Sequence, residues 1–268
     1  MKKTSFFVVC LLSLAICFSQ KKVLPAVQAT RFKNDTFNIL KYGAKADGLT
    51  LNTKSINDAI VDCNNKGGGV VLVPPGLWIT GAIELRSNVN LHLEKNAVLQ
   101  STTDFSQYKL VAGNWEGLPQ MRNQSPVSAT NQQNIAITGF GIIDGAGDAW
   151  RMVKREKLTE TAWKKLIASG GVVSDDKKTW YPTEQSQKAS KLKNPGEIKP
   201  EKTAASYEEV KDFLRPNLLV LTNCKKILLE GVTFQNSAAW CLHPIMSEDI
   251  TIRNLRKKSV VCPERRWD

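Results

Sequence analysis

The sequence predicts an all-β fold, a parallel β-helix in which short strands stack rung upon rung. Two stretches around Ile227 and Ile250 share one strand-like pattern and lie 23 residues apart. The apolar stretches that precede them open with Leu219 and Leu242, which are also 23 residues apart. A fixed step in this range, with Asn and Gly at the corners of short strands, is typical of a solenoid.

The same pattern recurs upstream in residues 88–93 and 134–139, whose separation of 46 residues predicts two such steps. One rung cannot bury its own apolar side chains, so each rung depends on its neighbours. With 268 residues and 42% hydrophobic content, the chain can bury a sizeable core. We therefore expect one main domain over residues 20–255.

The N-terminus predicts a secretory signal peptide over residues 1–19. Lys2 and Lys3 precede an apolar run from Phe6 to Phe18, and cleavage is expected after Ser19. The run is too short for a permanent span, which predicts a secreted or periplasmic protein without stable membrane insertion. A lipid anchor is an alternative, disfavoured by a bulky Ile where such a signal has a small residue.

The first elements of the mature chain predict an entering strand and a capping helix. Residues 37–48 suit a strand followed by a turn, and Asn52 or Thr53 can cap the helix that follows. Its apolar face repeats at helical spacing, and residues 67–69, all glycine, end it. Residues 70–73 then predict a buried strand. The helix would cover the open apolar end of the solenoid. That face comprises Ile56, Ala59, Ile60 and Cys63.

Rungs are expected from about Trp78 to Trp150. The glycines of residues 139–147 suggest a dinucleotide site, but they interrupt a strand-rich series instead of joining a strand to a helix. Residues 151–213 depart from the pattern as a polar insertion, with a helix expected over 158–169. Such an insertion either lies beside a binding cleft or forms a mobile surface excursion.

The cysteines of the mature chain predict buried free thiols, because their spacing matches neither a disulfide framework nor a zinc motif. Cys224 lies one 23-residue step before Ser247, so the two are expected at equivalent corners. The formal net charge of +12 predicts affinity for polyanions, or else a solvated basic surface. Secretion and the lack of a recognisable motif argue against nucleic acid. The cysteines are Cys63, Cys224, Cys241 and Cys262.

Four stretches together resemble glycoside hydrolase family 28, the pectin-degrading polygalacturonases. The most specific of them contains NSAAWCLHP at 236–244. The resemblance implies a right-handed, pectin-lyase-like β-helix that hydrolyses α-1,4-galacturonosyl bonds with inversion, without a cofactor. It also implies a pectic polysaccharide, polygalacturonate, as the partner. The stretches are residues 37–60, 68–100, 139–150 and 215–255.

The residues that carry catalysis in that family, two aspartate motifs, a histidine and an Arg-x-Lys, all correspond to positions after Leu255. We therefore assign no catalytic residue, and Asp175–Asp176 in the insertion is not taken as the catalytic pair. The candidate substrate-binding residues are Arg215, Trp240 and His243. Each has a structural alternative: Arg215 can position the chain after the insertion, and the two rings can belong to the core.

Residues 256–268 break the repeat and are expected to be an aberrant tail. Synonymous codons exist for them that, read from the second base and run into a TGA stop, encode VKNPWYAQNGDGI, which resembles the family's next segment. We hypothesise a frameshift after Leu255, testable by sequencing the DNA downstream. The expected product is an incomplete β-helix, inactive, and monomeric or aggregation-prone through unpaired strand edges.

Two rival functions remain. A secreted fragment can bind pectate weakly without catalysis. A β-helix lyase would need a calcium site of clustered carboxylates, which the predicted rungs do not offer, so no metal site is assigned.

Overall fold

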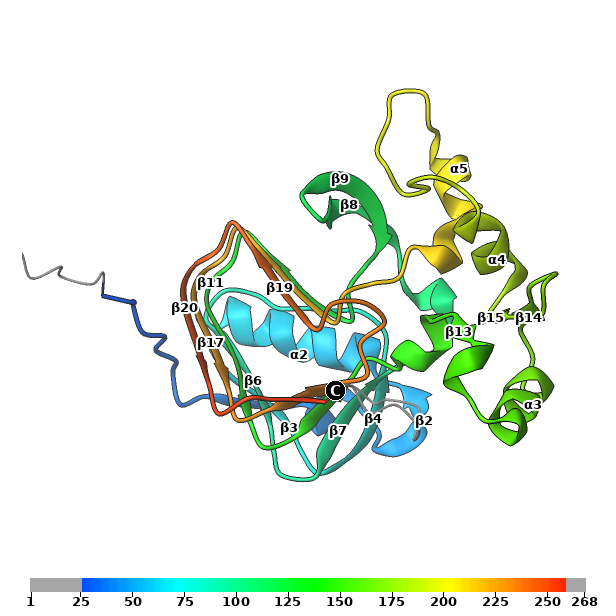
Figure 1. The fold of residues 1–268 in the computed structure, drawn as a ribbon. Coiled ribbons are helices and arrows are strands. Elements are labelled where there is room, and N and C mark those ends of the chain that lie inside the picture. The colour runs from blue at the N-terminus through cyan, green and yellow to red at the C-terminus, as the bar shows by residue number, and fades with distance from the viewer. Residues whose placement is uncertain (1–25, 259–268) are drawn as a thin grey trace, which may run out of the picture.

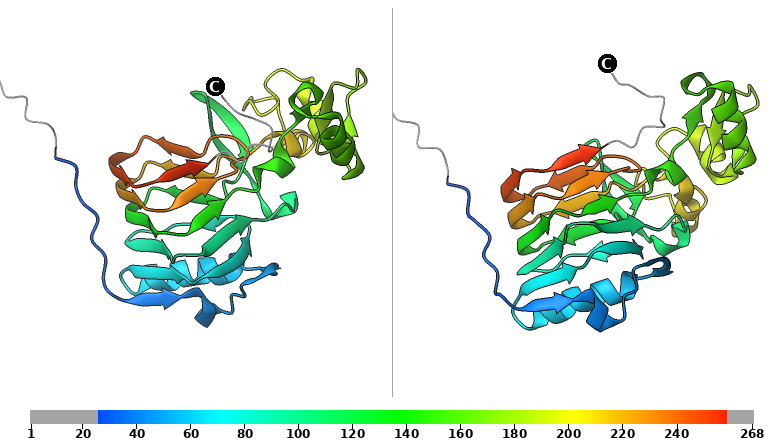
Figure 2. Two further views of the ribbon diagram at one scale, coloured as in Figure 1. Left: turned by 60° about the horizontal axis from the view of Figure 1, so that its bottom comes forward. Right: turned by 90° about the horizontal axis from the view of Figure 1, so that it is seen from below.

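The computed structural model describes residues 26–258 and confirms a parallel β-helix of three sheets around one core. The rungs stack from one end of the molecule to the other (Figures 1 and 2). Sheet 1 has the order β1 (Thr36–Asn38), β3 (Gly69–Val73), β6 (Val89–Leu93), β11 (Gln133–Gly139), β17 (Lys225–Glu230), β20 (Glu248–Arg253). Sheet 2 has the order β2 (Asp47–Leu51), β4 (Gly76–Thr80), β7 (Ala97–Ser101), β12 (Ile142–Asp144), β18 (Thr233–Gln235), β21 (Arg256–Lys258). Sheet 3 has the order β5 (Ile83–Glu84), β10 (Val127–Thr130), β16 (Leu219–Thr222), β19 (Leu242–Ile245).

Apolar ladders hold the rungs together, because alternate side chains of each strand point inward. One ladder runs through Val71, Leu91, Ile137, Leu229 and Ile252, which pair in register from strand to strand. The first four are buried, and each contributes about 1.5–3 kcal/mol relative to an exposed side chain. Ile252, in the last described strand of sheet 1, is 50% exposed.

The 23-residue step is confirmed by the register of the last rungs, where Ile227 pairs with Ile250 and Leu219 with Leu242. The 46-residue separation is not two steps, and that prediction is wrong. Leu91 pairs directly with Ile137, so the two stretches belong to adjacent rungs. The extra residues leave the solenoid as a 3₁₀ helix, η3 (Phe105–Gln107), and an antiparallel hairpin of β8 (Leu110–Trp115) and β9 (Leu118–Asn123).

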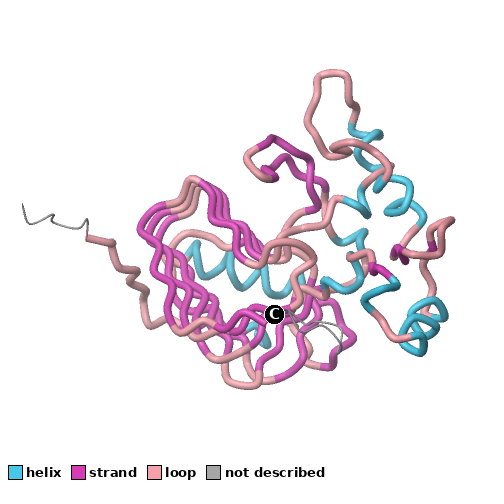
Figure 3. The backbone as a smooth tube through the Cα atoms, in the orientation of Figure 1, coloured by secondary structure: helices cyan, strands magenta, loops and turns pink. Residues whose placement is uncertain are grey.

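The predicted capping helix is α2 (Thr53–Asn65), which lies at the end of the stack where the chain enters and covers the first rungs (Figures 2 and 3). Its predicted apolar face, Cys63 included, is buried. Asn52 takes the cap position, but its side chain bonds neighbouring backbone, including Ile79 O of β4 at 3.2 Å, instead of the helix. The entering segment forms β1 and then a 3₁₀ helix, η2 (Ile39–Tyr42), before β2.

The insertion packs beside the solenoid with side chains of its own in its interior, among them Trp163 and Trp180. Ala189, Val210 and Leu214 pack together against Leu110 and Met121 of the hairpin. The predicted helix is α3 (Glu160–Ala168). The other elements are η4 (Gly147–Trp150), β13 (Val153–Lys154), η5 (Arg155–Lys157), β14 (Val172–Val173), β15 (Thr179–Tyr181), α4 (Glu184–Ser190), α5 (Ala204–Glu208) and η6 (Lys211–Phe213).

Cys63, Cys224 and Cys241 are buried free thiols, as predicted, and Cys262 lies outside the described residues. The Cys224 amide donates to Ser247 Oγ at 3.0 Å, so these two residues do occupy stacked corners. The predicted signal peptide also lies outside the described residues. Of the predicted tail, 256–258 form β21, which pairs with β18, so the sheet runs past the predicted boundary at Leu255. Within residues 26–258, no helix is long and apolar enough to cross a membrane.

Candidate functional site

A groove of about 370 Å³ lies between the outer face of sheet 3 and the β8–β9 hairpin. Side chains alternate along each strand, so residues such as Val127 fill the core and their neighbours point outward to form the floor of the groove. One outward ladder pairs Glu84 with Ser128, Ser128 with Val220, and Val220 with His243. The groove is lined by Glu84, Leu85, Arg86, Val111, Ala112, Gly113, Asn114, Arg122, Asn123, Gln124, Ser125, Ser128, Ala129, Thr130, Gln132, Asn217, Val220, Thr222, His243 and Ile245.

Two of the predicted binding residues, Trp240 and His243, are in direct contact at the edge of this groove. Their ring centroids lie 4.7 Å apart, edge to face. Trp240 is 39% exposed, so part of its ring is available to a ligand. Arg215 lies nearby: its Nη1 donates to the carbonyl oxygen of Ala238 at 3.2 Å, in the loop that carries Trp240.

The hairpin supplies two residues that the sequence analysis missed, Trp115 and Arg122. Trp115 stacks on Trp240 with centroids 5.2 Å apart and planes at 10°. The Arg122 guanidinium lies 3.7 Å from the centroid of the Trp115 ring and donates to the Arg215 carbonyl oxygen. A cation over an aromatic face is attractive. These contacts join the hairpin to the loop that carries Trp240 and to the segment that carries Arg215.

Asn217, also missed, holds the two aromatic rings in register. Its Oδ1 accepts from the Trp240 amide at 3.0 Å, so its Nδ2 faces His243 Nδ1 at 2.8 Å. An amide nitrogen only donates, so Nδ1 accepts and the imidazole is neutral, with its proton on Nε2. Burial lowers the pKa of His243, which favours the same neutral form.

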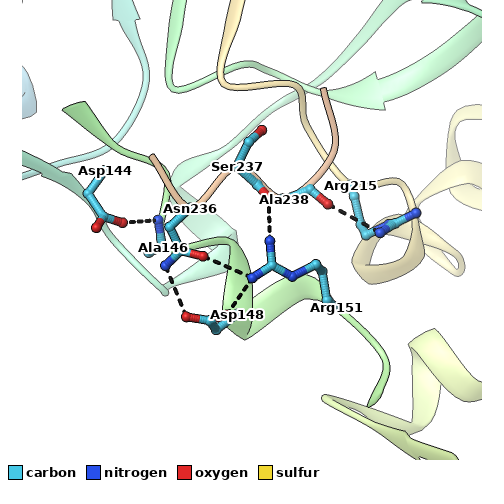
Figure 4. Close-up of polar contacts among 8 residues, drawn as sticks. All are labelled: Asp144, Ala146, Asp148, Arg151, Arg215, Asn236, Ser237 and Ala238. Carbon is cyan, nitrogen blue, oxygen red and sulfur yellow. Dashed lines mark hydrogen bonds and ion pairs between the residues drawn. The ribbon is translucent and has the colours of Figure 1, made fainter. Parts of the chain in front are cut away.

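A polar cluster fixes the loop that leads to Trp240 (Figure 4). Arg151 pairs with Asp148, and it donates to Asn236 Oδ1 at 3.0 Å and to the Ser237 carbonyl oxygen at 2.6 Å. Asn236 Nδ2 donates back to Asp148 at 3.0 Å. Gly147 permits this approach, because a Cβ there would lie 2.4 Å from the Ser237 carbonyl carbon.

The remaining acids of interest have structural partners. Asp176 accepts from Ser174 Oγ at 2.6 Å and from the Lys178 amide at 3.0 Å, which lowers its pKa, and Asp175 pairs with Lys191. These contacts keep both carboxylates within the insertion. Over residues 26–258, no three His, Cys, Asp or Glu side chains lie close enough to hold a metal ion.

Comparison with known proteins gives a consistent family. Residues 36–167 match the family model described as rhamnogalacturonase A/epimerase, pectate lyase-like. A probable polygalacturonase of Vitis vinifera is 27% identical over 85% of this chain and 37% of its own length. An exo-poly-alpha-D-galacturonosidase of Dickeya chrysanthemi is 33% identical over 52% of this chain and 24% of its own length.

Among solved structures, the hyperthermoactive exopolygalacturonase of Thermotoga maritima superposes with a TM-score of 0.63 at 28% identity, covering 87% of this chain and 49% of that one. The chain thus spans well under half the length of the two curated relatives. The family model, the relatives and the solved structure agree in their similarity to polygalacturonases and pectate lyase-like proteins, which supports a polygalacturonase-like family for this chain.

Proposed function

We propose that the chain binds polygalacturonate in the groove of sheet 3, as part of a pectin-degrading, inverting glycoside hydrolase. The observation that carries this proposal is the pair of stacked rings, Trp115 and Trp240, beside a groove lined with amides, hydroxyls and arginine. Tryptophan offers an apolar face for a sugar ring, and a few placed polar groups then fix its orientation. The relatives' names support the substrate class.

Binding is tested by retention of the purified chain on immobilised polygalacturonate. Trp240→Ala is expected to weaken retention at least about tenfold, by analogy with aromatic platforms for nucleic-acid bases, whose removal costs roughly 1–3 kcal/mol per stacked ring. Phe140→Ala is the matched control, because Phe140 is an exposed aromatic that does not line the groove. Equal retention of both variants and the wild type would contradict the proposal, as would no retention of the wild type.

We further propose that this chain does not hydrolyse its ligand. Inversion needs a carboxylic acid and a carboxylate about 6.5–9.5 Å apart on opposite sides of the bond. Among the described residues, Glu84 is the single carboxylate of the groove lining, and its Oε1 accepts from Gln124 Nε2 at 2.7 Å. Purified chain is expected to release no reducing sugar from polygalacturonate above a heat-denatured control. Release that disappears in Glu84→Gln would overturn this.

Secretion is part of the proposal, because pectic polysaccharide is an extracellular polymer. Mass spectrometry of the chain exported by its source cell is expected to show Gln20 as the first residue. A first residue at Met1 on exported or retained protein would contradict the predicted cleavage.

A further inference from the structure

Two guanidinium groups beside the groove form no ion pair with a carboxylate within residues 26–258. Arg122 and Arg215 are both part-buried, and neither forms an ion pair there. Each makes one hydrogen bond to a carbonyl oxygen, Arg122 to Arg215 and Arg215 to Ala238. A guanidinium has five N–H donors, so most of their donors face no described protein acceptor.

Burial and neighbouring positive charge make the charged form of both arginines costly. Burial and then repulsion from Arg215 lower the pKa of Arg122 to about 9, opposed by Glu116. Burial and then repulsion from Arg151 lower the pKa of Arg215. Asp148, the carboxylate that pairs with Arg151, is already engaged by Arg151 and Asn236. Partly desolvated like charges are costly unless an anion lies between or beside them.

A buried acceptor without a partner lies next to Arg122. Asn123 is 2% exposed and lines the groove. Its Nδ2 donates to the carbonyl oxygens of Lys211 and Leu214 at 2.7 and 2.9 Å. Its Oδ1 has no partner among the described residues. Since a buried acceptor left unpaired is costly, this atom indicates a ligand that donates a hydrogen bond.

We propose that Arg122, Arg215 and Asn123 form a subsite for one uronic acid residue, with the arginines on its carboxylate and Asn123 Oδ1 on a hydroxyl. The inference rests on the proposed binding of galacturonan and deepens it. Arg122 also lies over Trp115, which places this charge at the aromatic pair. A sugar ring against the exposed part of Trp240 then presents its carboxylate to the arginines.

The subsite has a consequence for selectivity, because methyl esterification removes the charge that the arginines meet. The chain should therefore bind a de-esterified oligogalacturonate at least about tenfold more tightly than the same oligomer fully methyl-esterified, as charge-assisted hydrogen bonds are about twice as strong as neutral ones. The preference should shrink as salt is raised, although less than for exposed charges.

The experiment measures, by titration calorimetry, the affinities of the full chain for trigalacturonate and for its trimethyl ester. Arg122→Met keeps an apolar stem over Trp115 and removes the charge. It is expected to abolish the preference for the free acid while retaining the affinity for the ester within about threefold. Arg122→Lys keeps the charge and loses the planar fork, and should keep only part of the preference. Arg253→Gln, which removes an equal charge from an exposed pair with Glu230, is the control.

The outcomes separate the two proposals. If wild type binds neither oligomer, the proposed function fails. If it binds both equally, or if Arg122→Met keeps the preference for the free acid, the carboxylate subsite is wrong while galacturonan binding stands. Should Arg122→Met fail to fold, the comparison of free acid and ester on the wild type still decides whether a carboxylate is recognised.

Discussion

Asn217 is the residue on which the geometry of the groove edge depends. One amide accepts from the Trp240 backbone and donates to the His243 ring, so it fixes a loop, a ring orientation and a tautomer at once. No sequence pattern indicates this role, because an Asn before a strand is equally typical of a turn. A histidine held in this way is expected to titrate at lower pH than a free one.

Titration of His243 should make the stability of the chain depend on pH. Its pKa in the folded chain is lowered by burial, so the unfolded chain binds more protons between the folded pKa and about 6.5. The contribution of the neutral ring is therefore fully present above about pH 6.5 and is lost as pH falls through the folded pKa. Urea unfolding between pH 8 and pH 5 should show a smaller loss of stability for His243→Gln than for the wild type.

A groove residue without a titratable side chain provides the control for this measurement. Ser128 lies on the same outward ladder as His243 and lines the groove. Ser128→Ala should keep the wild-type dependence on pH. A His243→Gln profile that parallels the wild type would contradict the assignment.

Helix α2 and the corners between successive strands hold the solenoid in shape. Helix α2 places its apolar stripe on the core, while the corners between strands need residues that tolerate positive φ. Asn residues occupy many of these corners, among them Asn88, Asn134 and Asn223. Such residues adopt this conformation more readily than most non-glycine residues.

Helix α2 offers a matched pair of substitutions. Ile60 is fully buried and its neighbour Val61 is 42% exposed. Ile60→Ala is expected to lower the free energy of unfolding by about 2–5 kcal/mol, because it leaves a cavity. Val61→Ala should change it by less than about 0.5 kcal/mol. Similar losses in both variants, measured by urea denaturation, would mean that the helix does not cap the core.

The corner glycine at position 139 offers a second pair. Gly139 has φ of 110°, and a Cβ there would lie 2.0 Å from the Leu93 carbonyl oxygen. Gly139→Ala should cost at least about 2 kcal/mol through strain and displacement of that rung. In Gly113→Ala the added Cβ would meet only the Gln120 carbonyl oxygen, at 3.7 Å. Thermal unfolding should separate the two, and equal midpoints would contradict the account.

These elements also show what the sequence could predict. The 23-residue repeat and the spacing of apolar residues predicted the solenoid, the capping helix, the buried cysteines and the stacked Cys224 and Ser247 corners. Each of these follows from a pattern that is local in the sequence. The hairpin was missed because its turn, Glu116–Gly117, lacks the usual Asn-Gly or Asp-Gly pair, although both residues have positive φ. Trp115 and Arg122 were missed with it. Their partners lie about a hundred residues away, beyond any local signal.

The molecule consists of a stack of rungs, each in contact with its neighbours, and of one segment that runs across several rungs. Residues 26–34 run along the outside of the rung corners (Figure 2). The Gln28 amide donates to Asp249 Oδ1 at 2.9 Å, and Arg31 exchanges two hydrogen bonds with the Asn134 side chain, at 2.9 and 2.7 Å. The segment thus joins β20 and β11 to the entering strand β1.

Deletion of residues 26–32 should lower the stability of the whole stack. A chain that starts at Lys33 should lose about 1–2 kcal/mol of stability relative to one that starts at Ala26, since it lacks these three hydrogen bonds. The Ala26 start is the control, because it keeps all of them. Differential scanning calorimetry measures the effect, and coincident transitions for the two chains would show that the segment contributes nothing.

The crossing segment has a further consequence for how the stack comes apart. In a solenoid with contacts only between neighbouring rungs, the outermost rung can open alone, and the two ends open independently of each other. Here the release of β20 at Asp249 also frees the backbone of Gln28, whose chain enters the opposite end of the stack. Opening at one end therefore loosens the other, and amide exchange in β1 and β20 should rise and fall together.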